Sequence, residues 1–390
     1  MSDRIRIALL GATGSIGRST LEVVRRHPDR FEVVAVSAHR SHEALAAVVD
    51  EFDPRHIALA DEVTDLPAGA EGWMRGAEAL TELAALDRVD VVVNAVIGAA
   101  GLGPTLAALE AGKRVALANK ESLVAGGDLV LAVAERTGGQ IIPIDSEHSA
   151  ILQCLAGSDM SSVRRIVLTA SGGPFRGRSA DELADVRPSD ALKHPTWDMG
   201  AKITIDSASL ANKALEVIEA RVLYRMDYDR IDAVVHPQSI IHSFVEFVDG
   251  SVLAQVGDPT MEIPIMYALT YPERLEDVEL QGYDPIASSP LTFEPIDEGA
   301  FPMFRVGVDA GRAGGVATAA FNAANEIAVA AFLEERIRFP EMALVVERAI
   351  ESVGSSVAIS IDDVMRADAQ ARSAANATIE HLAQGIRTTT

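Results

Sequence analysis

Cysteine is almost absent from this chain of 390 residues, and basic residues are scarce relative to acidic ones. The single cysteine, Cys154, excludes an internal disulfide and fits a reducing compartment. Lysine and arginine together number 34 against 57 aspartates and glutamates, which gives a formal net charge of −23. Because phosphate-rich partners need a basic surface, this balance argues against binding to nucleic acid or to an anionic membrane.

Long apolar runs are lacking as well. The longest uncharged stretch, Val91–Leu109, is long enough on length alone for a membrane helix. It is interrupted by residues that end strands and start turns: Asn94, Gly98, Gly101, Gly103 and Pro104. We therefore expect no membrane segment and a soluble cytoplasmic protein, whose 48% hydrophobic residues suffice for a large core.

Short apolar segments alternate with helix-length segments through the first part of the chain. Strands are predicted at Ile5–Leu10, Phe31–Ser37, Val89–Val93 and Arg114–Leu117. Such alternation is typical of an α/β fold in which helices cover both faces of a parallel sheet. We therefore predict a Rossmann-like, doubly wound N-terminal domain.

The pattern changes after residue 147, and we expect three domains and a linker. The Rossmann-like domain comprises residues 1–147, and a central α/β (α+β) domain comprises residues 148–270, with a long irregular loop at about 172–200. Residues 271–296 contain four prolines and little periodicity, which predicts a linker. The alanine-rich residues 297–390 predict a C-terminal helical bundle.

A glycine turn, Gly11-x-x-Gly14-x-x-Gly17, lies between the first strand and a helical segment. Glycines in this context let a pyrophosphate approach the backbone, and the helix N-terminus favours its negative charge. The alternative is a glycine turn with a structural role only. The strand and the helix on either side of the motif favour nucleotide binding.

The end of the second strand indicates which nucleotide would bind. NAD sites usually carry an acidic residue there, whereas this chain has His39, Arg40 and Ser41. Arginine can pair with a 2′-phosphate and serine can donate to it, so the segment favours NADP over NAD. The alternative is that Arg40 is an ordinary solvated surface residue.

Two carboxylates follow another predicted strand, in the segment Asp145-Ser146-Glu147. If the chain is extended here, residues two apart point the same way, and Asp145 and Glu147 face one spot. Hard oxygen ligands suit Mg²⁺ or Mn²⁺. A solvated acidic turn is the alternative.

A second polar cluster lies in the segment Ser207–Glu216, which the pattern predicts to be one helix. Asn212, Lys213 and Glu216 are spaced so that they share a face of this helix. The alternative is a weak Lys–Glu pair on the surface. Neighbouring leucines make much of the same helix apolar, which favours a partly buried polar stripe.

The long loop begins with Ser171 and two glycines, a place where backbone amides and a hydroxyl can meet an anion. Near its end lies Trp197, one of two tryptophans, followed by Met199. A large apolar ring on an irregular loop suits a lid that excludes water, and permanent packing is the alternative. His148, His236, His242 and Cys154 lie on helix or strand patterns, and we interpret them as core or supporting residues.

Taken in order, these motifs resemble the 1-deoxy-D-xylulose 5-phosphate reductoisomerase family over nearly the whole chain. The segments that carry the resemblance are Gly11–Gly17, Asn119-Lys120-Glu121, Asp145-Ser146-Glu147, Ser171–Phe175, His194–Gly200, the helix through Glu216 and Asn322-Ala323-Ala324-Asn325-Glu326. The resemblance implies an NADPH- and divalent-metal-dependent enzyme that converts the ketose phosphate to 2-C-methyl-D-erythritol 4-phosphate for isoprenoid synthesis. It also implies a cytoplasmic homodimer that binds a small sugar phosphate.

The resemblance assigns roles residue by residue. Cofactor-binding positions are Thr13, Gly14, Ser15, Ile16, His39, Arg40, Ser41, Asn119, Glu121, Gly200 and Met261. Metal ligands are Asp145, Glu147 and Glu216, with Mg²⁺ or Mn²⁺ as the ion. Substrate-binding positions are Lys120, Ser146, Glu147, Ser171, His194, Ser207, Asn212, Lys213 and Glu216. The catalytic set is Lys120, Asp145, Glu147, His194 and Glu216, and the lid residues are Trp197 and Met199.

Two other functions remain open from the residues alone. A semialdehyde-dehydrogenase-like NADP oxidoreductase also begins with such a glycine turn, but it needs a nucleophilic cysteine. Cys154 lies in an apolar helical segment, where a lowered thiol pKa is not expected. A non-catalytic NADPH-sensing regulator would need the glycine turn but not three carboxylates.

Overall fold

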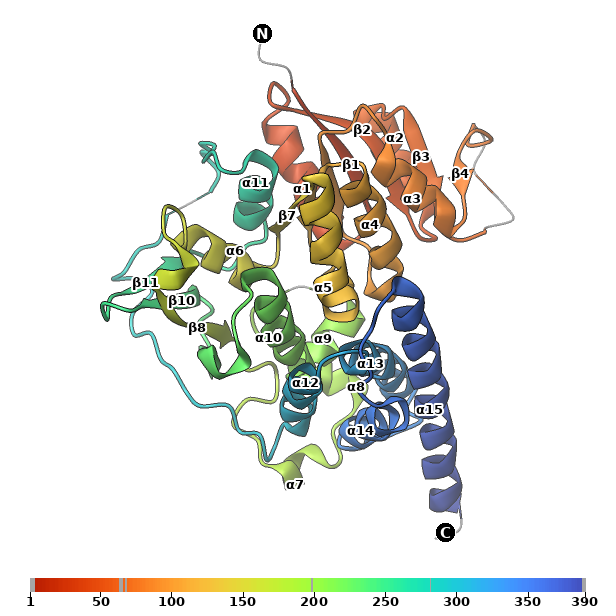
Figure 1. The fold of residues 1–390 in the computed structure, drawn as a ribbon, viewed down its shortest axis with the longest axis vertical. Coiled ribbons are helices and arrows are strands. Elements are labelled where there is room, and N and C mark those ends of the chain that lie inside the picture. The colour runs from red at the N-terminus through yellow and green to blue at the C-terminus, as the bar shows by residue number, and fades with distance from the viewer. Residues whose placement is uncertain (1–3, 63–65, 67–68, 198, 281, 388–390) are drawn as a thin grey trace. The chain divides into compact units, whose positions relative to one another are not determined.

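The computed structural model describes residues 4–62, 66, 69–197, 199–280 and 282–387. They form two compact units (Figure 1). The first unit comprises Met1–Ser122, Val130–Leu152 and Thr260–Gln281, and the second comprises Leu123–Leu129, Gln153–Pro259 and Gly282–Thr390. The division into domains at residues 147, 270 and 296 stays a prediction.

The first unit is built on a seven-stranded parallel sheet in the order β4-β3-β2-β1-β5-β6-β7. Its strands are β1 (Ile5–Leu10), β2 (Phe31–Ala38), β3 (His56–Leu59), β4 (Met74–Arg75), β5 (Val91–Asn94), β6 (Arg114–Leu117) and β7 (Gln140–Pro143). The order reverses between β1 and β5, which is where doubly wound sheets bind ligands at the carboxyl ends of their strands. The predicted fold class is confirmed.

Helices accompany these strands, drawn in red to yellow in Figure 1 except for α11, which is teal. They are α1 (Ser15–Arg26), α2 (His42–Phe52), α3 (Ala77–Ala85), α4 (Leu102–Glu110), α5 (Lys120–Thr137), α6 (Ser146–Cys154) and, from much later in the chain, α11 (Glu262–Thr270). Helix α11 packs against α1 and contributes Ile265 and Leu269 to the core of the first unit. Its apolar residues explain why this distant segment joins the first unit.

The second unit contains a four-stranded sheet in the order β11-β10-β8-β9. Its strands are β8 (Val163–Ala170), β9 (Ile231–Val235), β10 (Ile241–Phe247) and β11 (Val252–Val256). Strands β8 and β9 are parallel, and the other two pairs are antiparallel. Between β8 and β9 run α7 (Ala180–Leu183), α8 (Pro188–Ala191), α9 (Ala201–Ser209) and α10 (Ala211–Tyr224).

The C-terminal helices belong to the same unit, in blue in Figure 1. They are α12 (Pro302–Ala313), α13 (Ala317–Leu333), α14 (Glu341–Val353) and α15 (Ile361–Arg387). Helix α13 packs against α14, α15 and α9, and its alanines allow the helices to approach closely. Across the described part of the chain, no helix combines the length and the apolar character needed to cross a membrane.

Candidate active site

The glycine turn joins β1 to α1 in the first unit. The backbone N–H groups of Gly11 and Ala12 donate to the carbonyl of Ser37 on β2, at 3.1 and 2.7 Å. A methyl group on Gly17 would lie 2.2 Å from the carbonyl oxygen of Gly11, so only glycine lets α1 pack this closely on the turn. The N-terminal backbone of α1, starting at Ser15, is therefore held at the carboxyl edge of the sheet, where it favours a phosphate group.

The residues after β2 lie exposed at the same edge. Arg40 donates from Nε to Oδ2 of Asp61 at 2.7 Å, and its side chain is 71% exposed. Asp61 is a residue that the sequence reasoning missed. Because Asp61 follows β3, the strand next to β2, the shared edge of a parallel sheet was the signal that could have found it.

Asn119 has its side chain buried inside the first unit. Its Nδ2 donates to the carbonyls of Val96 and Gly98, at 2.7 and 2.8 Å, and its Oδ1 accepts the backbone N–H of Ser122 at 3.0 Å. The amide therefore ties the loop after β5 to the start of α5. Its side chain positions the loops at the switch point of the sheet.

Asp145 lies where β7 gives way to α6, and the expectation of an extended chain through Glu147 is wrong. The strand ends at Pro143 and the helix begins at Ser146. The carboxylate of Asp145 accepts the backbone N–H of Glu147 at 3.3 Å, as carboxylates do at helix starts, and its carbonyl accepts the N–H of Ser149 at 2.8 Å. These local bonds draw the chain into a helical turn, which a strand pattern in the sequence does not reveal.

Lys120 and His148 surround the Asp145 carboxylate within the first unit. Lys120 forms an ion pair with Oδ2, and His148 Nδ1 lies 3.5 Å from Oδ1. Burial alone would raise the pKa of Asp145, but the charge of Lys120 and the contact with His148 outweigh it and hold this pKa well below its ordinary value. Asp145 is therefore ionised and suited to a hard cation.

The second unit brings together Ser171, His194 and Ser207, which the sequence placed on three separate segments. His194 Nε2 lies 3.1 Å from the hydroxyl oxygen of Ser171 and 3.1 Å from that of Ser207. Ser171 follows β8, His194 lies on the long loop, and Ser207 lies on α9. We call these three residues the serine–histidine cluster.

The protonation state of His194 follows from its other ring nitrogen. Nδ1 accepts the backbone N–H groups of Thr196 and Trp197, at 3.1 and 2.9 Å, so it carries no proton. Burial lowers the pKa of His194, which favours the neutral ring. The proton of the neutral ring is therefore on Nε2, which can donate to an oxygen within the cluster.

The predicted helix Ser207–Glu216 is two helices, because Leu210 adopts a left-handed conformation with φ of 60° between α9 and α10. The prediction of one helix was wrong, since no glycine or proline marks the break. Leu210 itself is buried in the core, which stabilises this conformation against its local cost. Asn212, Lys213 and Glu216 all lie on α10.

The Glu216 carboxylate contacts the side chains of both Asn212 and Lys213. Asn212 Nδ2 donates to Glu216 Oε1, and Lys213 forms an ion pair with Glu216 Oε2 and donates to the carbonyl of Thr169. The side chains of Lys213 and Glu216 are 3% and 2% exposed, which excludes the alternative of a surface ion pair. A buried anion beside a lysine and an amide is the arrangement expected of a polar site within a core.

The long loop is packed at several buried side chains, and residues 176–182, between the first two of them, are exposed. Phe175, Leu183 and Ala191 are buried, and Phe175 makes an edge-to-face contact with Phe339, with 5.2 Å between ring centroids. The expected lid residues Trp197 and Met199 follow this packed part and are half-buried. The chain after Ala191 also contains exposed residues, as a lid requires, but exposure in this loop is not confined to it.

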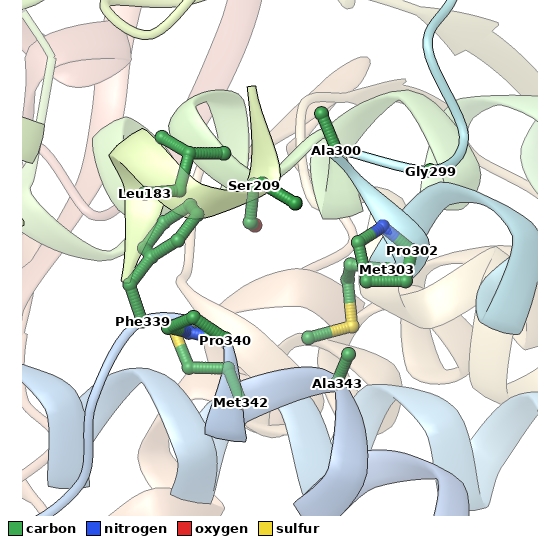
Figure 2. Close-up of a pocket in the computed structure, with 11 residues that line it drawn as sticks. Leu183, Ser209, Gly299, Ala300, Pro302, Met303, Phe339, Pro340, Met342 and Ala343 are labelled. Atoms are coloured by element: carbon green, nitrogen blue, oxygen red, sulfur yellow. The ribbon is translucent and has the colours of Figure 1, made fainter. Parts of the chain in front are cut away.

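A hollow of about 80 Å³ also lies in the second unit, as Figure 2 shows. Its described lining is apolar apart from one hydroxyl group: Ala180, Leu183, Ser209, Gly299, Ala300, Pro302, Met303, Phe339, Pro340, Met342 and Ala343. It offers no charged side chain to a phosphorylated ligand. We therefore do not include the hollow in the site formed by the polar and charged side chains described above.

The remaining predicted residues divide between the two units. Thr13, Gly14, Ser15, Ile16, Ser146, Glu147 and Met261 are half-buried in the first unit, where Glu121 is buried and His39 and Ser41 are exposed; Gly200 is exposed in the second unit. Asp145 and Glu147 belong to the first unit, and Glu216 to the second. His148, His236, His242 and Cys154 are buried, as a core or supporting role requires.

Family models match three parts of the chain. The model described as 1-deoxy-D-xylulose 5-phosphate reductoisomerase matches residues 7–127, and that of its C-terminal domain matches residues 141–224. A third model, described as the DXP reductoisomerase C-terminal domain, matches residues 256–374. Together they cover most of the chain.

Relatives and solved structures agree with these models. The chain is 49% identical to 1-deoxy-D-xylulose 5-phosphate reductoisomerase of Chlorobium chlorochromatii, over 95% of the chain and 98% of the relative. It is 50% identical to that of Nocardia farcinica, over 95% and 94%. The Zymomonas mobilis enzyme, solved in complex with NADPH, is 42% identical with a TM-score of 0.89, and the alignment covers 97% of this chain and 100% of that one. A DOX-P reductoisomerase solved with NADPH, fosmidomycin and magnesium is 40% identical with a TM-score of 0.90, over 97% and 99%. The chain therefore belongs to the 1-deoxy-D-xylulose 5-phosphate reductoisomerase family.

Proposed function

We infer that this protein converts 1-deoxy-D-xylulose 5-phosphate to 2-C-methyl-D-erythritol 4-phosphate, with NADPH as reductant and a divalent metal as cofactor. The observation that carries this inference is family membership along most of the chain, with relatives about half identical in sequence. Two solved relatives hold NADPH, and one of these also holds fosmidomycin and magnesium. Mg²⁺ is therefore the metal that we assign.

NADPH binds to the first unit in this proposal. The residues of this unit that would hold it are Thr13, Gly14, Ser15 and Ile16 at the glycine turn, His39, Arg40 and Ser41 after β2, and Asn119, Glu121 and Met261. The family resemblance gives Gly200, of the second unit, the same role. The close packing of Gly17 on the turn supports this assignment, because it holds the N-terminus of α1 next to the pyrophosphate position. Arg40 would keep its ion pair with Asp61 through Nε, while its terminal nitrogens bind the 2′-phosphate.

Asp145, Glu147 and Glu216 are the proposed metal ligands. Their carboxylates are the hard donors that Mg²⁺ prefers, and the lowered pKa of Asp145 keeps one of them charged. Lys120 and Lys213 contact Asp145 and Glu216, respectively, and would compensate the buried charge when the metal is absent. Ser146 lies between two of the ligands, and its hydroxyl donates to Glu147 at 2.6 Å.

The serine–histidine cluster, with Asn212 and Lys213, would bind the sugar phosphate. The neutral imidazole of His194 offers its Nε2 proton, and the hydroxyls of Ser171 and Ser207 can each donate or accept. Lys213 supplies a positive charge from a buried position. Trp197 and Met199, on the exposed end of the loop, would cover the bound substrate and exclude water.

The bound cofactors supply the chemistry that the side chains lack: the metal polarises the ketone and hydroxyl oxygens during rearrangement, and the nicotinamide provides a hydride. The chain's own residues orient the substrate. Lys120 keeps Asp145 ionised, and the cluster holds the substrate by groups remote from the reacting carbons, so that binding energy contributes to orientation. Neither a semialdehyde-dehydrogenase-like oxidoreductase nor a non-catalytic NADPH-sensing regulator is favoured. The burial of Cys154 removes the nucleophile that a semialdehyde dehydrogenase needs.

The test is an NADPH oxidation assay with the purified protein and the pentulose phosphate. We expect oxidation that needs Mg²⁺, stops with a chelator, returns on adding the metal, and resists a thiol-blocking reagent. NADH serves as the matched control and should support a slower reaction. Oxidation that survives the chelator, or that the thiol reagent abolishes, would contradict the proposal.

We also propose a cytoplasmic homodimer that pairs through the central domain predicted over residues 148–270, by the strands after Ala233. Strand β11 is at the edge of its sheet, and Val252 and Leu253 on it are 52% and 48% exposed. An exposed apolar edge strand is a surface that proteins usually cover. Light scattering at micromolar concentration should give twice the mass of one chain, and a monomer would refute this part.

A further inference from the structure

A buried carboxylate next to the serine–histidine cluster has no role in the reaction described above. Asp206 lies on α9 directly before Ser207, and it is 1% exposed. Its Oδ1 accepts a hydrogen bond of 2.8 Å from Nδ2 of Asn325 on α13, which is fully buried. Its Oδ2 lies 2.8 Å from Nζ of Lys202, one turn earlier on α9. Asp206 thus links α9 to a helix of the C-terminal bundle.

The position of α9 controls the geometry of the cluster. Ser207 on this helix lies 3.1 Å from His194, which also contacts Ser171. The loop that carries Ser171 rests on the same helix, since a methyl group on Gly173 would lie 2.7 Å from the carbonyl oxygen of Ser207. A shift of α9 would therefore move Ser207 relative to both of its partners.

Burial of the Asp206–Asn325 pair is an unfavourable way, in free energy, to stabilise the packing of two helices. A buried carboxylate costs free energy, and apolar residues of the same size usually stabilise a core as well or better. Within the described residues, Asn325 Oδ1 accepts no hydrogen bond, so the amide contributes mainly its donation to Asp206. A hydrogen bond is directional, so it specifies one register between α9 and α13. An apolar contact is not directional and does not specify a register in this way.

We propose that Asp206 and Asn325 are positioning residues, which hold α9 in the register that lets Ser207 and His194 bind the substrate. The proposal rests on the proposed function, and it deepens that function by placing a determinant of substrate affinity on the C-terminal bundle. Neither residue contacts the substrate; both act through Ser207.

Asn322 provides a matched control for Asn325. It lies one turn earlier on α13, it is equally buried, and its Nδ2 donates to Glu326 at 3.2 Å rather than to α9. We expect Asn325→Ala to raise the KM for the sugar phosphate about tenfold and to lower kcat/KM on the order of 10- to 100-fold, as small misplacements of binding groups do. The KM for NADPH should change by less than about twofold. Asn322→Ala should destabilise the protein to a similar extent without changing either KM.

Exchanging the two side chains gives a second test that does not depend on Asn325→Ala folding. Asn325→Asp alone puts two carboxylates against each other, which is unfavourable, while the double variant Asp206→Asn with Asn325→Asp restores an amide–carboxylate hydrogen bond. We expect the double variant to recover most of the substrate affinity that Asn325→Asp loses.

Three results are decisive. If Asn325→Ala and Asn322→Ala have the same kinetic constants, or if the exchange recovers nothing, the positioning role is refuted. If the two asparagine variants differ and the exchange recovers the KM, the role is supported. If the wild-type protein itself shows no metal-dependent NADPH oxidation, the proposed function has failed instead.

Discussion

Replacing Gly173 by alanine tests whether the long loop, at about residues 172–200, must pack directly on α9. The added methyl group would lie 2.7 Å from the carbonyl oxygen of Ser207 and 3.1 Å from Cα of Ala208. The shortest real contacts of this kind are about 3.0 Å, and ordinary contact begins at 3.4 Å. The loop and the helix must therefore separate by 0.3 Å (3.0 − 2.7) to 0.7 Å (3.4 − 2.7).

Gly173→Ala is expected to lose stability for two reasons, and the variant Gly177→Ala separates them. Gly173 has φ of +64°, so alanine there loses about 1–2 kcal/mol of stability from the backbone conformation alone. Gly177, on the same loop, has φ of +81° but nothing within 4 Å of an added methyl group. Gly177→Ala should therefore show only the conformational cost. Gly173→Ala should lose about 1–3 kcal/mol more from overpacking against the helix backbone.

The kinetic consequence is specific to Gly173. A separation of several tenths of an ångström moves Ser171 away from Ser207, so we expect kcat/KM for the sugar phosphate to fall about tenfold. Urea unfolding measures the free energies of unfolding. Steady-state kinetics measures kcat/KM for the sugar phosphate, and a parallel titration measures the affinity for NADPH. NADPH affinity should be unchanged in both variants. If Gly173→Ala and Gly177→Ala were alike in stability and in kcat/KM, the close approach of loop and helix would be wrong.

Four further outcomes are expected. Arg40→Asp should lower the NADPH over NADH preference by about tenfold or more, because a charge-assisted hydrogen bond contributes about 1.5–3 kcal/mol; an unchanged ratio of kcat/KM values would refute the 2′-phosphate contact. His194→Gln, which keeps a donor near the Nε2 position, should retain more kcat/KM than His194→Asn, and the reverse order would refute the assigned tautomer. Glu216→Gln should weaken Mg²⁺ binding and abolish most turnover while NADPH still binds, and wild-type turnover at limiting Mg²⁺ would remove Glu216 from the metal ligands. Because burial lowers the pKa of folded His194, its contribution to stability is complete above the unfolded pKa of about 6.5 and falls as pH drops below it; urea unfolding near pH 7.5 and 5.5 should show less loss for His194→Gln than for wild type.

Local patterns were sufficient for the fold class and for the glycine turn between β1 and α1. Alternating apolar segments predicted the parallel sheet because strand and helix periods are properties of neighbouring residues. The glycine turn was recognisable because its strand, turn and helix are consecutive in the chain. The resemblance to the family rested on the order of several such local motifs, and the family comparisons confirm it.

Local patterns failed at two places, one decided by core packing and one by local hydrogen bonds that apolar periodicity does not reveal. Nothing near Leu210 predicts its left-handed conformation, which is stabilised by burial of its side chain and divides the expected helix into α9 and α10. The turn at Asp145 was interpreted as extended because the helix start depends on hydrogen bonds made by that side chain and its carbonyl.

The sequence by itself determined which chemical groups this protein has and the order in which they occur along the chain. Only the tertiary structure decided which of those groups meet. Ser171, His194 and Ser207 come from a strand end, a loop and a helix, and Asp206 finds its partner Asn325 at a separation of 119 residues. The physical reason is that such contacts depend on how buried surfaces pack, which is a property of the whole core and not of any short segment.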